Sequence, residues 1–91
     1  MKKKFELIYS TQFHKQFNCL DKPVRVRVLR ELEILENNPL AGKALTGDLQ
    51  GLRSFRVGNY RVIYQITDYS ITIITIKHRK KVYDPWTKFT C

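Results

Sequence analysis

The sequence predicts an α+β fold in which one antiparallel sheet, preceded by an N-terminal strand, packs against a helical hairpin. Two observations favour this class. Apolar residues between positions 11 and 36 recur at helical spacing, and residues 52–78 contain three β-rich runs separated by short turns. With 91 residues, 43% of them hydrophobic, the chain is predicted to form a single domain over residues 1–91 with enough apolar material for a core.

The helical hairpin follows a short strand. Alternating apolar residues predict this strand at Phe5, Leu7 and Tyr9. Ser10 and Thr11 can cap a first helix over about residues 11–19, whose apolar face is Phe13, Phe17 and Leu20. Pro23 suits the first turn of a second helix, which ends before Pro39. Its apolar stripe is Val24, Val28, Leu32 and Leu35.

The remaining segments predict a loop, a meander and a tail. Residues 37–51 contain three glycines and predict a loop held down by its leucines, Leu40, Leu45 and Leu49. Strands are predicted at about 52–57, 60–66 and 71–78, and together they form an antiparallel meander. Residues 79–91 predict a tail or one turn of helix.

The charge is strongly positive. Seventeen Lys and Arg against eight Asp and Glu give a net charge of +9 and a pI near 9.8, which indicates an anionic partner such as nucleic acid or an acidic protein. Residues 52–91 contain eight basic and two acidic side chains, so most of the excess positive charge lies in the part of the chain that contains the predicted meander. No apolar run approaches the roughly 20 residues of a spanning helix, and a cytoplasmic protein with no membrane partner is predicted.

The first hairpin predicts a specific pair of residues. If Gly58 and Asn59 are the central residues of a tight primed turn, Val57 faces Tyr60 and Arg56 faces Arg61. Two arginines directly opposite each other repel unless an anion lies between them. The hairpin therefore predicts an anion site on the face of the sheet that the helices leave open.

The second hairpin extends this prediction along the last strand. If Ile66 pairs with Ile71, Ile76 lies opposite Arg61, Lys77 points towards the helices and His78 lies on the arginine face. The set expected on the open face is Arg56, Arg61, His78, Arg79 and Tyr83.

Such a set suits metal-independent cleavage of RNA, in which the 2′-hydroxyl attacks the adjacent phosphorus. Arginine forks can hold the phosphate and its developing charge. Tyr83 is a candidate base whose pKa nearby cations would lower, although its ring could instead stack on a nucleobase or pack the tail onto the sheet. His78 is at most a supporting acid or base. No cofactor is predicted, and the absence of metal-ligand spacing argues against a two-metal nuclease.

Two runs of the sequence carry a resemblance to a known family. Residues 55–64 read Phe-Arg-Val-Gly-Asn-Tyr-Arg-Val-Ile-Tyr, and residues 78–83 read His-Arg-Lys-Lys-Val-Tyr. They resemble the R-V-G-D-Y-R-V-I-Y run and the H-R-x-x-V-Y ending of the RelE/ParE superfamily of toxins from type II toxin–antitoxin modules. The resemblance implies a small toxin that cleaves mRNA in the ribosomal A site or, in the ParE branch, poisons DNA gyrase. It also implies a hetero-oligomer with a cognate acidic antitoxin.

Carried over by position, the resemblance implies catalytic roles for Arg61, Arg79 and Tyr83. It implies substrate binding by the basic residues around them, which are Arg56, Lys77, His78, Lys80 and Lys81. One departure is Ser54, which stands where many RNA-cleaving members have a basic residue, while Arg53 is expected on the opposite face. The functions left open are a ribosome-dependent mRNA endoribonuclease, a gyrase inhibitor or other non-nucleolytic toxin, and a basic binding module without toxicity.

Overall fold

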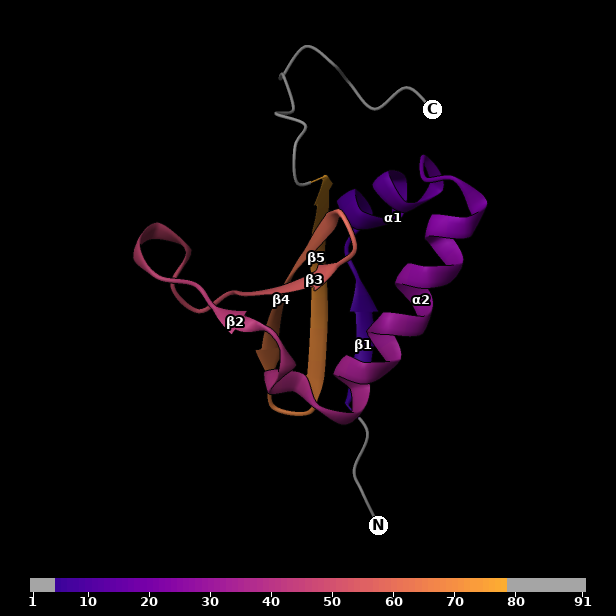
Figure 1. The fold of residues 1–91 in the computed structure, drawn as a ribbon. Coiled ribbons are helices and arrows are strands. Elements are labelled where there is room, and N and C mark those ends of the chain that lie inside the picture. Colours follow the sequence, from indigo (N-terminus) through magenta and orange to yellow (C-terminus); the bar gives the residue numbers. More distant parts are fainter. Residues whose placement is uncertain (1–4, 79–91) are drawn as a thin grey trace.

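The computed structural model describes residues 5–78, and the predicted tail over 79–91 lies outside this range. The elements in chain order are β1 (Glu6–Tyr9), α1 (Thr11–Asn18), α2 (Lys22–Asn37), the 3-10 turn η1 (Pro39–Ala41), β2 (Lys43–Ala44), the 3-10 turn η2 (Gly47–Leu49), β3 (Arg53–Val57), β4 (Tyr60–Thr67) and β5 (Ser70–His78) (Figure 1). None of the helices in the described range is long and apolar enough to cross a membrane.

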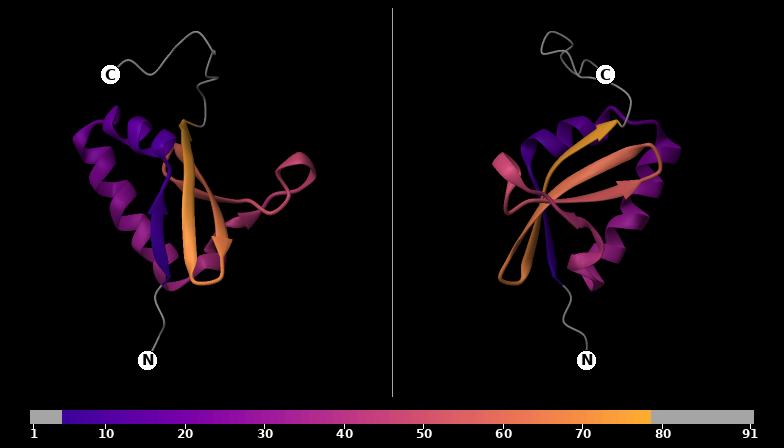
Figure 2. Two further views of the ribbon diagram at one scale, coloured as in Figure 1. Left: turned by 180° about the vertical axis from the view of Figure 1, so that it is seen from behind. Right: turned by 60° about the vertical axis from the view of Figure 1, so that its left-hand side comes forward.

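The strands form one sheet in the order β1-β5-β4-β3-β2. β1 runs parallel to β5, and the other neighbouring strands are antiparallel. Both helices gather on one side of the molecule, and the loop that contains β2 and η2 reaches away from them (Figures 1 and 2). The predicted α+β class is confirmed. The strand count differs, because two residues of the predicted loop pair with β3 as β2.

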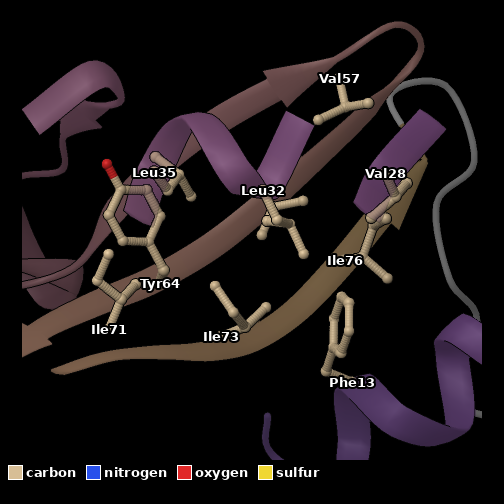
Figure 3. Close-up of a cluster of buried hydrophobic side chains, with 10 residues drawn as sticks. Phe13, Val28, Leu32, Leu35, Val57, Tyr64, Ile71, Ile73 and Ile76 are labelled. Atoms are coloured by element: carbon tan, nitrogen blue, oxygen red, sulfur yellow. The ribbon is translucent and has the colours of Figure 1, made fainter. Parts of the chain in front are cut away.

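The helices begin and pack as their sequences predict. The Ser10 hydroxyl caps α1 by accepting a hydrogen bond of 3.0 Å from the Phe13 backbone N–H, and Pro23 lies in the first turn of α2. Val28, Leu32 and Leu35 of α2 are at most 1% exposed. They meet Phe13 and the inner residues of the sheet, which are Val57, Val62, Tyr64, Ile71, Ile73 and Ile76 (Figure 3). This cluster is the core.

The loop between α2 and β3 is held by polar contacts, and two of the three leucines predicted to anchor it are exposed. Leu40 is 67% exposed and Leu49 is 51% exposed, so the predicted anchoring is wrong for these two residues. Instead, the Arg53 guanidinium donates through Nη2 to the carbonyl oxygens of Leu40 (3.2 Å) and Gly42 (2.6 Å). The Tyr64 hydroxyl also accepts from the Gly42 N–H at 3.1 Å. These hydrogen bonds satisfy backbone groups of the loop and tie it to β3 and β4.

A β-bulge shifts the pairing of β5 with β4. Near the turn Ile66 pairs with Ile71, as predicted, but the register changes between Ile63 and Tyr64. Ile63 then faces Thr75 while Tyr64 faces Ile73, which leaves Ile74 as the extra residue.

Contacts from α1 and its cap hold the bulge. The Ser10 hydroxyl donates to the Ile74 carbonyl oxygen. The Gln16 side-chain oxygen accepts from the Ile76 N–H (2.9 Å) and from the Thr75 hydroxyl (2.8 Å). Because Gln16 is 4% exposed, these hydrogen bonds are shielded from water, and the bulged strand is fixed from a distant part of the sequence.

Candidate nucleic-acid interface

The tip of the β3–β4 hairpin has the predicted register. Val57 pairs with Tyr60, Arg56 pairs with Arg61, and Gly58 adopts φ +59°. Among the described non-glycine residues only Asp68 has a positive φ, so Asn59 does not. A glycine with positive φ at the first central position is typical of a type II′ turn, which matches the twist of the flanking strands.

Three cations lie in a row across the sheet at this tip. Arg61 lies opposite Arg56 of β3 on one side and opposite Lys77 of β5 on the other. Directly opposite residues in antiparallel strands project from the same face, so the three side chains share the face that carries no helix. All three are exposed, and within residues 5–78 none of them has an ion-pair partner. We call Arg56, Arg61 and Lys77 the cation row.

The bulge corrects two sequence-based predictions. Without it Ile76 would face Arg61; with it Lys77 does, and Ile76 pairs with Val62 in the core. Lys77 is therefore on the arginine face and not on the helix side. His78 pairs with Tyr60 and is not on the arginine face. Shifting a strand by one residue exchanges its two faces, which explains both errors.

His78 and Tyr60 contact each other beside the cation row. Their ring centroids are 5.0 Å apart with an interplanar angle of 85°, an edge-to-face arrangement. His78 is partly buried. It therefore lies next to the arginine face, at the end of β5, without belonging to it.

A shallow depression of about 80 Å³ marks the hairpin tip, and it is lined by Arg56, Gly58, Tyr60 and Arg61. The Arg56 guanidinium approaches the Gly58 carbonyl oxygen through Nε at 3.4 Å. Tyr60 was not among the predicted site residues. Its signal in the sequence is its position directly between the turn and Arg61. An open depression with two guanidinium groups at its wall can contact a phosphodiester.

The structure also shows which predicted residues it does and does not bring together. Arg56 and Arg61 are side by side, and Lys77 joins them. Arg79, Lys80, Lys81 and Tyr83 lie outside the described residues. Ser54 faces Ile63 on the open face, while Arg53 pairs with Tyr64 on the helix side, as predicted, and is occupied with the loop carbonyls. Among residues 5–78 no group of three or more His, Cys, Asp or Glu is placed to hold a metal ion.

Comparison with known proteins places this chain in a family. Residues 7–83 match the family model described as the ParE toxin of the type II toxin–antitoxin system parDE. A Toxin RelE from Mycobacterium tuberculosis is 48% identical over 52 residues, so the chain spans 54% of the length of this curated relative.

Solved structures agree with the family match. The toxin–antitoxin complex RelBE2 of Mycobacterium tuberculosis superposes with a TM-score of 0.79 at 27% identity, covering 86% of this chain and 94% of that one. The archaeal RelE–RelB complex from Pyrococcus horikoshii superposes with a TM-score of 0.71 at 31% identity, covering 87% of this chain and 99% of the other. The isolated Escherichia coli RelE toxin shares the fold. It superposes with a TM-score of 0.72 at 18% identity, covering 86% of this chain and 87% of that one. By fold and by sequence, this chain belongs to the RelE/ParE family of type II toxin–antitoxin toxins.

Proposed function

We propose that this toxin is a ribosome-dependent mRNA endoribonuclease that inhibits translation. The observation that carries the proposal is the cation row. Three like charges in adjacent register, exposed and without an ion-pair partner in the described part of the chain, disfavour the free protein and favour a bound anion. A phosphodiester of RNA is an anion that fits an open, shallow site of this kind.

The proposed reaction needs no metal ion. The 2′-hydroxyl of the RNA attacks the adjacent phosphorus, and the bond to the 5′-oxygen of the next nucleotide breaks. Arg61, at the centre of the cation row, stabilises the charge that develops on the phosphate oxygens, and Arg56 and Lys77 hold the same phosphate from either side.

Residues beyond the cation row complete the proposed site. Tyr83 takes the 2′-proton or orients the nucleotide, and Arg79 assists the departing 5′-oxygen. Lys80 and Lys81 add contacts to the RNA backbone. His78 lies on the other face of β5 and takes a binding role through its contact with Tyr60, which lines the depression.

Cleavage on translating ribosomes tests the proposal. Primer extension with the wild-type toxin should reveal new mRNA ends. Arg61→Gln and Tyr83→Phe should each lower the yield of these ends by about 100- to 1000-fold, the range expected for groups that stabilise charge or move a proton. Lys15→Gln is the matched control, because Lys15 is an exposed cation of α1 and not of the open face of the sheet. Absence of new mRNA ends with the wild-type protein would rule the activity out.

The partner we propose is an acidic antitoxin. The related structures from Mycobacterium tuberculosis and Pyrococcus horikoshii are a toxin–antitoxin complex and a RelE–RelB complex. A net charge of +9 favours an acidic segment that covers the cation row and forms a hetero-oligomer with the toxin. The proposed ribosomal target implies a cytoplasmic location. A short acidic protein encoded next to this chain would be the candidate antitoxin, and its co-expression should relieve growth arrest and yield a stable complex.

Inhibition of DNA gyrase is the second candidate, and the position of Arg53 favours it. Ser54 leaves the open face without the basic residue found in many RNA-cleaving relatives, and Arg53 cannot replace it because its guanidinium binds the carbonyls of Leu40 and Gly42. A supercoiling assay separates the candidates. Loss of supercoiling by a toxin preparation that produces no mRNA ends would support gyrase as the target, and unchanged supercoiling would exclude it.

A further inference from the structure

Arg27 of α2 reaches the hairpin tip from the helix side. A Cβ atom built on Gly58 would lie 3.0 Å from Arg27 Nη1 and 3.3 Å from Arg27 Cζ, so the guanidinium lies directly against the turn. Gly58 also lines the depression with Arg56 and Arg61. Arg27 thus brings a further positive charge to the same site, although it lies on a different element and far from these arginines in sequence.

The charge balance makes this position unfavourable for an arginine in the free protein. Arg27 is exposed, and its long side chain has many conformations that would keep its charge in water and away from other cations. In the structure its guanidinium instead lies against Gly58, whose carbonyl oxygen is also approached by Arg56. No acidic side chain in the described range pairs with Arg27 to offset the repulsion.

The turn provides the room for this contact. Gly58 has no side chain, and a Cβ at that position would meet the Arg27 guanidinium at less than normal contact distance. Next to Arg27 along α2, Val28 is fully buried in the same core cluster as Val57, the residue before the turn. The helix is therefore fixed against the hairpin, and this packing places Arg27 beside the tip.

We propose that Arg27 is an RNA-binding residue that contacts the phosphate next to the one held by the cation row. The inference rests on the proposed function, since it extends the same site from the sheet to α2. The RNA backbone would then cross the hairpin tip from the face of the cation row, over Gly58, to the first half of α2. Each phosphate contact of this kind displaces a counterion and contributes to the salt dependence of binding.

Direct binding tests this role without relying on cleavage. The probe is a fluorescein-labelled 12-nucleotide single-stranded RNA with 2′-O-methyl groups, which cannot be cut by 2′-hydroxyl attack. Fluorescence anisotropy at 50 to 300 mM salt should show that Arg27→Gln binds about three- to fivefold more weakly at the lowest salt, with a slope of log K against log salt that is smaller by about 0.7. Arg27→Lys should keep the slope.

Two variants separate RNA binding from other effects of the substitution. Arg25→Gln removes the same charge from α2 at a position about 200° around the helix, so it should change the slope much less. Arg27→Met keeps an apolar stem that can pack on the turn but lacks the charge, and it should bind as weakly as Arg27→Gln. Thermal unfolding of each variant establishes that it is folded.

The outcomes distinguish this inference from the proposed function. If Arg27→Gln binds like Arg25→Gln, or Arg27→Met binds like the wild type, the role of Arg27 is refuted, while cleavage that depends on Arg61 would still stand. If the wild type cuts no mRNA but Arg27→Gln shows the reduced affinity and slope, Arg27 is an RNA-binding residue of a protein with a different target.

Discussion

Removing the central charge of the cation row should stabilise the free protein. Arg61 faces a cation on each side, Arg56 and Lys77, and opposed side chains in a sheet have Cβ atoms about 5 Å apart. With the charges themselves about 6.5 Å apart in water, each pair costs about 0.6 kcal/mol, so that Arg61→Gln should raise the free energy of unfolding by about 1 kcal/mol at low salt. At 150 mM salt, screening should reduce this gain to about 0.5 kcal/mol.

Urea denaturation measures this difference without adding ions. Wild type and Arg61→Gln should be unfolded at 10 mM and 150 mM salt, with Lys43→Gln as the control that removes a charge facing Ser54. In a domain of this size a gain of about 1 kcal/mol corresponds to a rise in Tm of about 4 to 8 °C at low salt. A short 2′-O-methyl RNA should stabilise the wild type more than Arg61→Gln, because an anion removes the repulsion that the variant lacks.

Two results would refute this reasoning. If Arg61→Gln is no more stable than the wild type at 10 mM salt, Arg61 makes favourable contacts that offset the repulsion. If the gain is the same at both salt concentrations, or equals that of Lys43→Gln, it does not come from the charges in the cation row. Either result would remove the main physical argument for an anion site at the hairpin tip.

Three further predictions concern the framework of the site. Tyr64→Phe removes a hydroxyl that donates to the Pro39 carbonyl oxygen (2.7 Å) and accepts from the Gly42 N–H (3.1 Å), so urea denaturation should show a loss of about 1 to 3 kcal/mol; an unchanged midpoint would mean that water replaces both hydrogen bonds. Gly58→Ala should cost about 1 to 2 kcal/mol because of φ +59°, and a variant of wild-type Tm would contradict the turn geometry. Leu32→Ala empties part of a core in which Leu32 is 1% exposed, and it should lower the free energy of unfolding by about 2 to 5 kcal/mol; a loss under 1 kcal/mol would show that the core collapses around the gap.

The cation row links stability to function in this protein. Repulsion within the cation row is predicted to make the free toxin less stable to unfolding than the Arg61→Gln variant. An acidic antitoxin or RNA would supply the missing negative charge. Like charges that lie side by side at a cost to stability are typical of a binding site and not of an ordinary solvated surface. The stability experiments therefore measure the repulsion in the free protein, and the binding experiments measure its relief by a bound anion.

Local sequence signals determined the helices and the first hairpin. The stripe of Val28, Leu32 and Leu35 faces the core because apolar residues at helical spacing have only one side to bury. The two-residue turn at Gly58 fixes the pairing of Arg56 with Arg61, because the hairpin loop leaves no freedom in the register of the residues next to it. These features depend on contacts between residues that are close in sequence.

Only the tertiary structure decided which residues of β5 join the arginines. The bulge at Ile74 is held by Ser10 and Gln16, which lie about 60 residues away in sequence. No pattern within the sequence of β5 predicts it. Because side chains alternate between the faces of a strand, this single extra residue exchanges the positions of Lys77 and His78. In the same way, the approach of Arg27 to the turn depends on how α2 packs on the sheet, since helical periodicity fixes the side of a helix that is buried but not the partner that it meets.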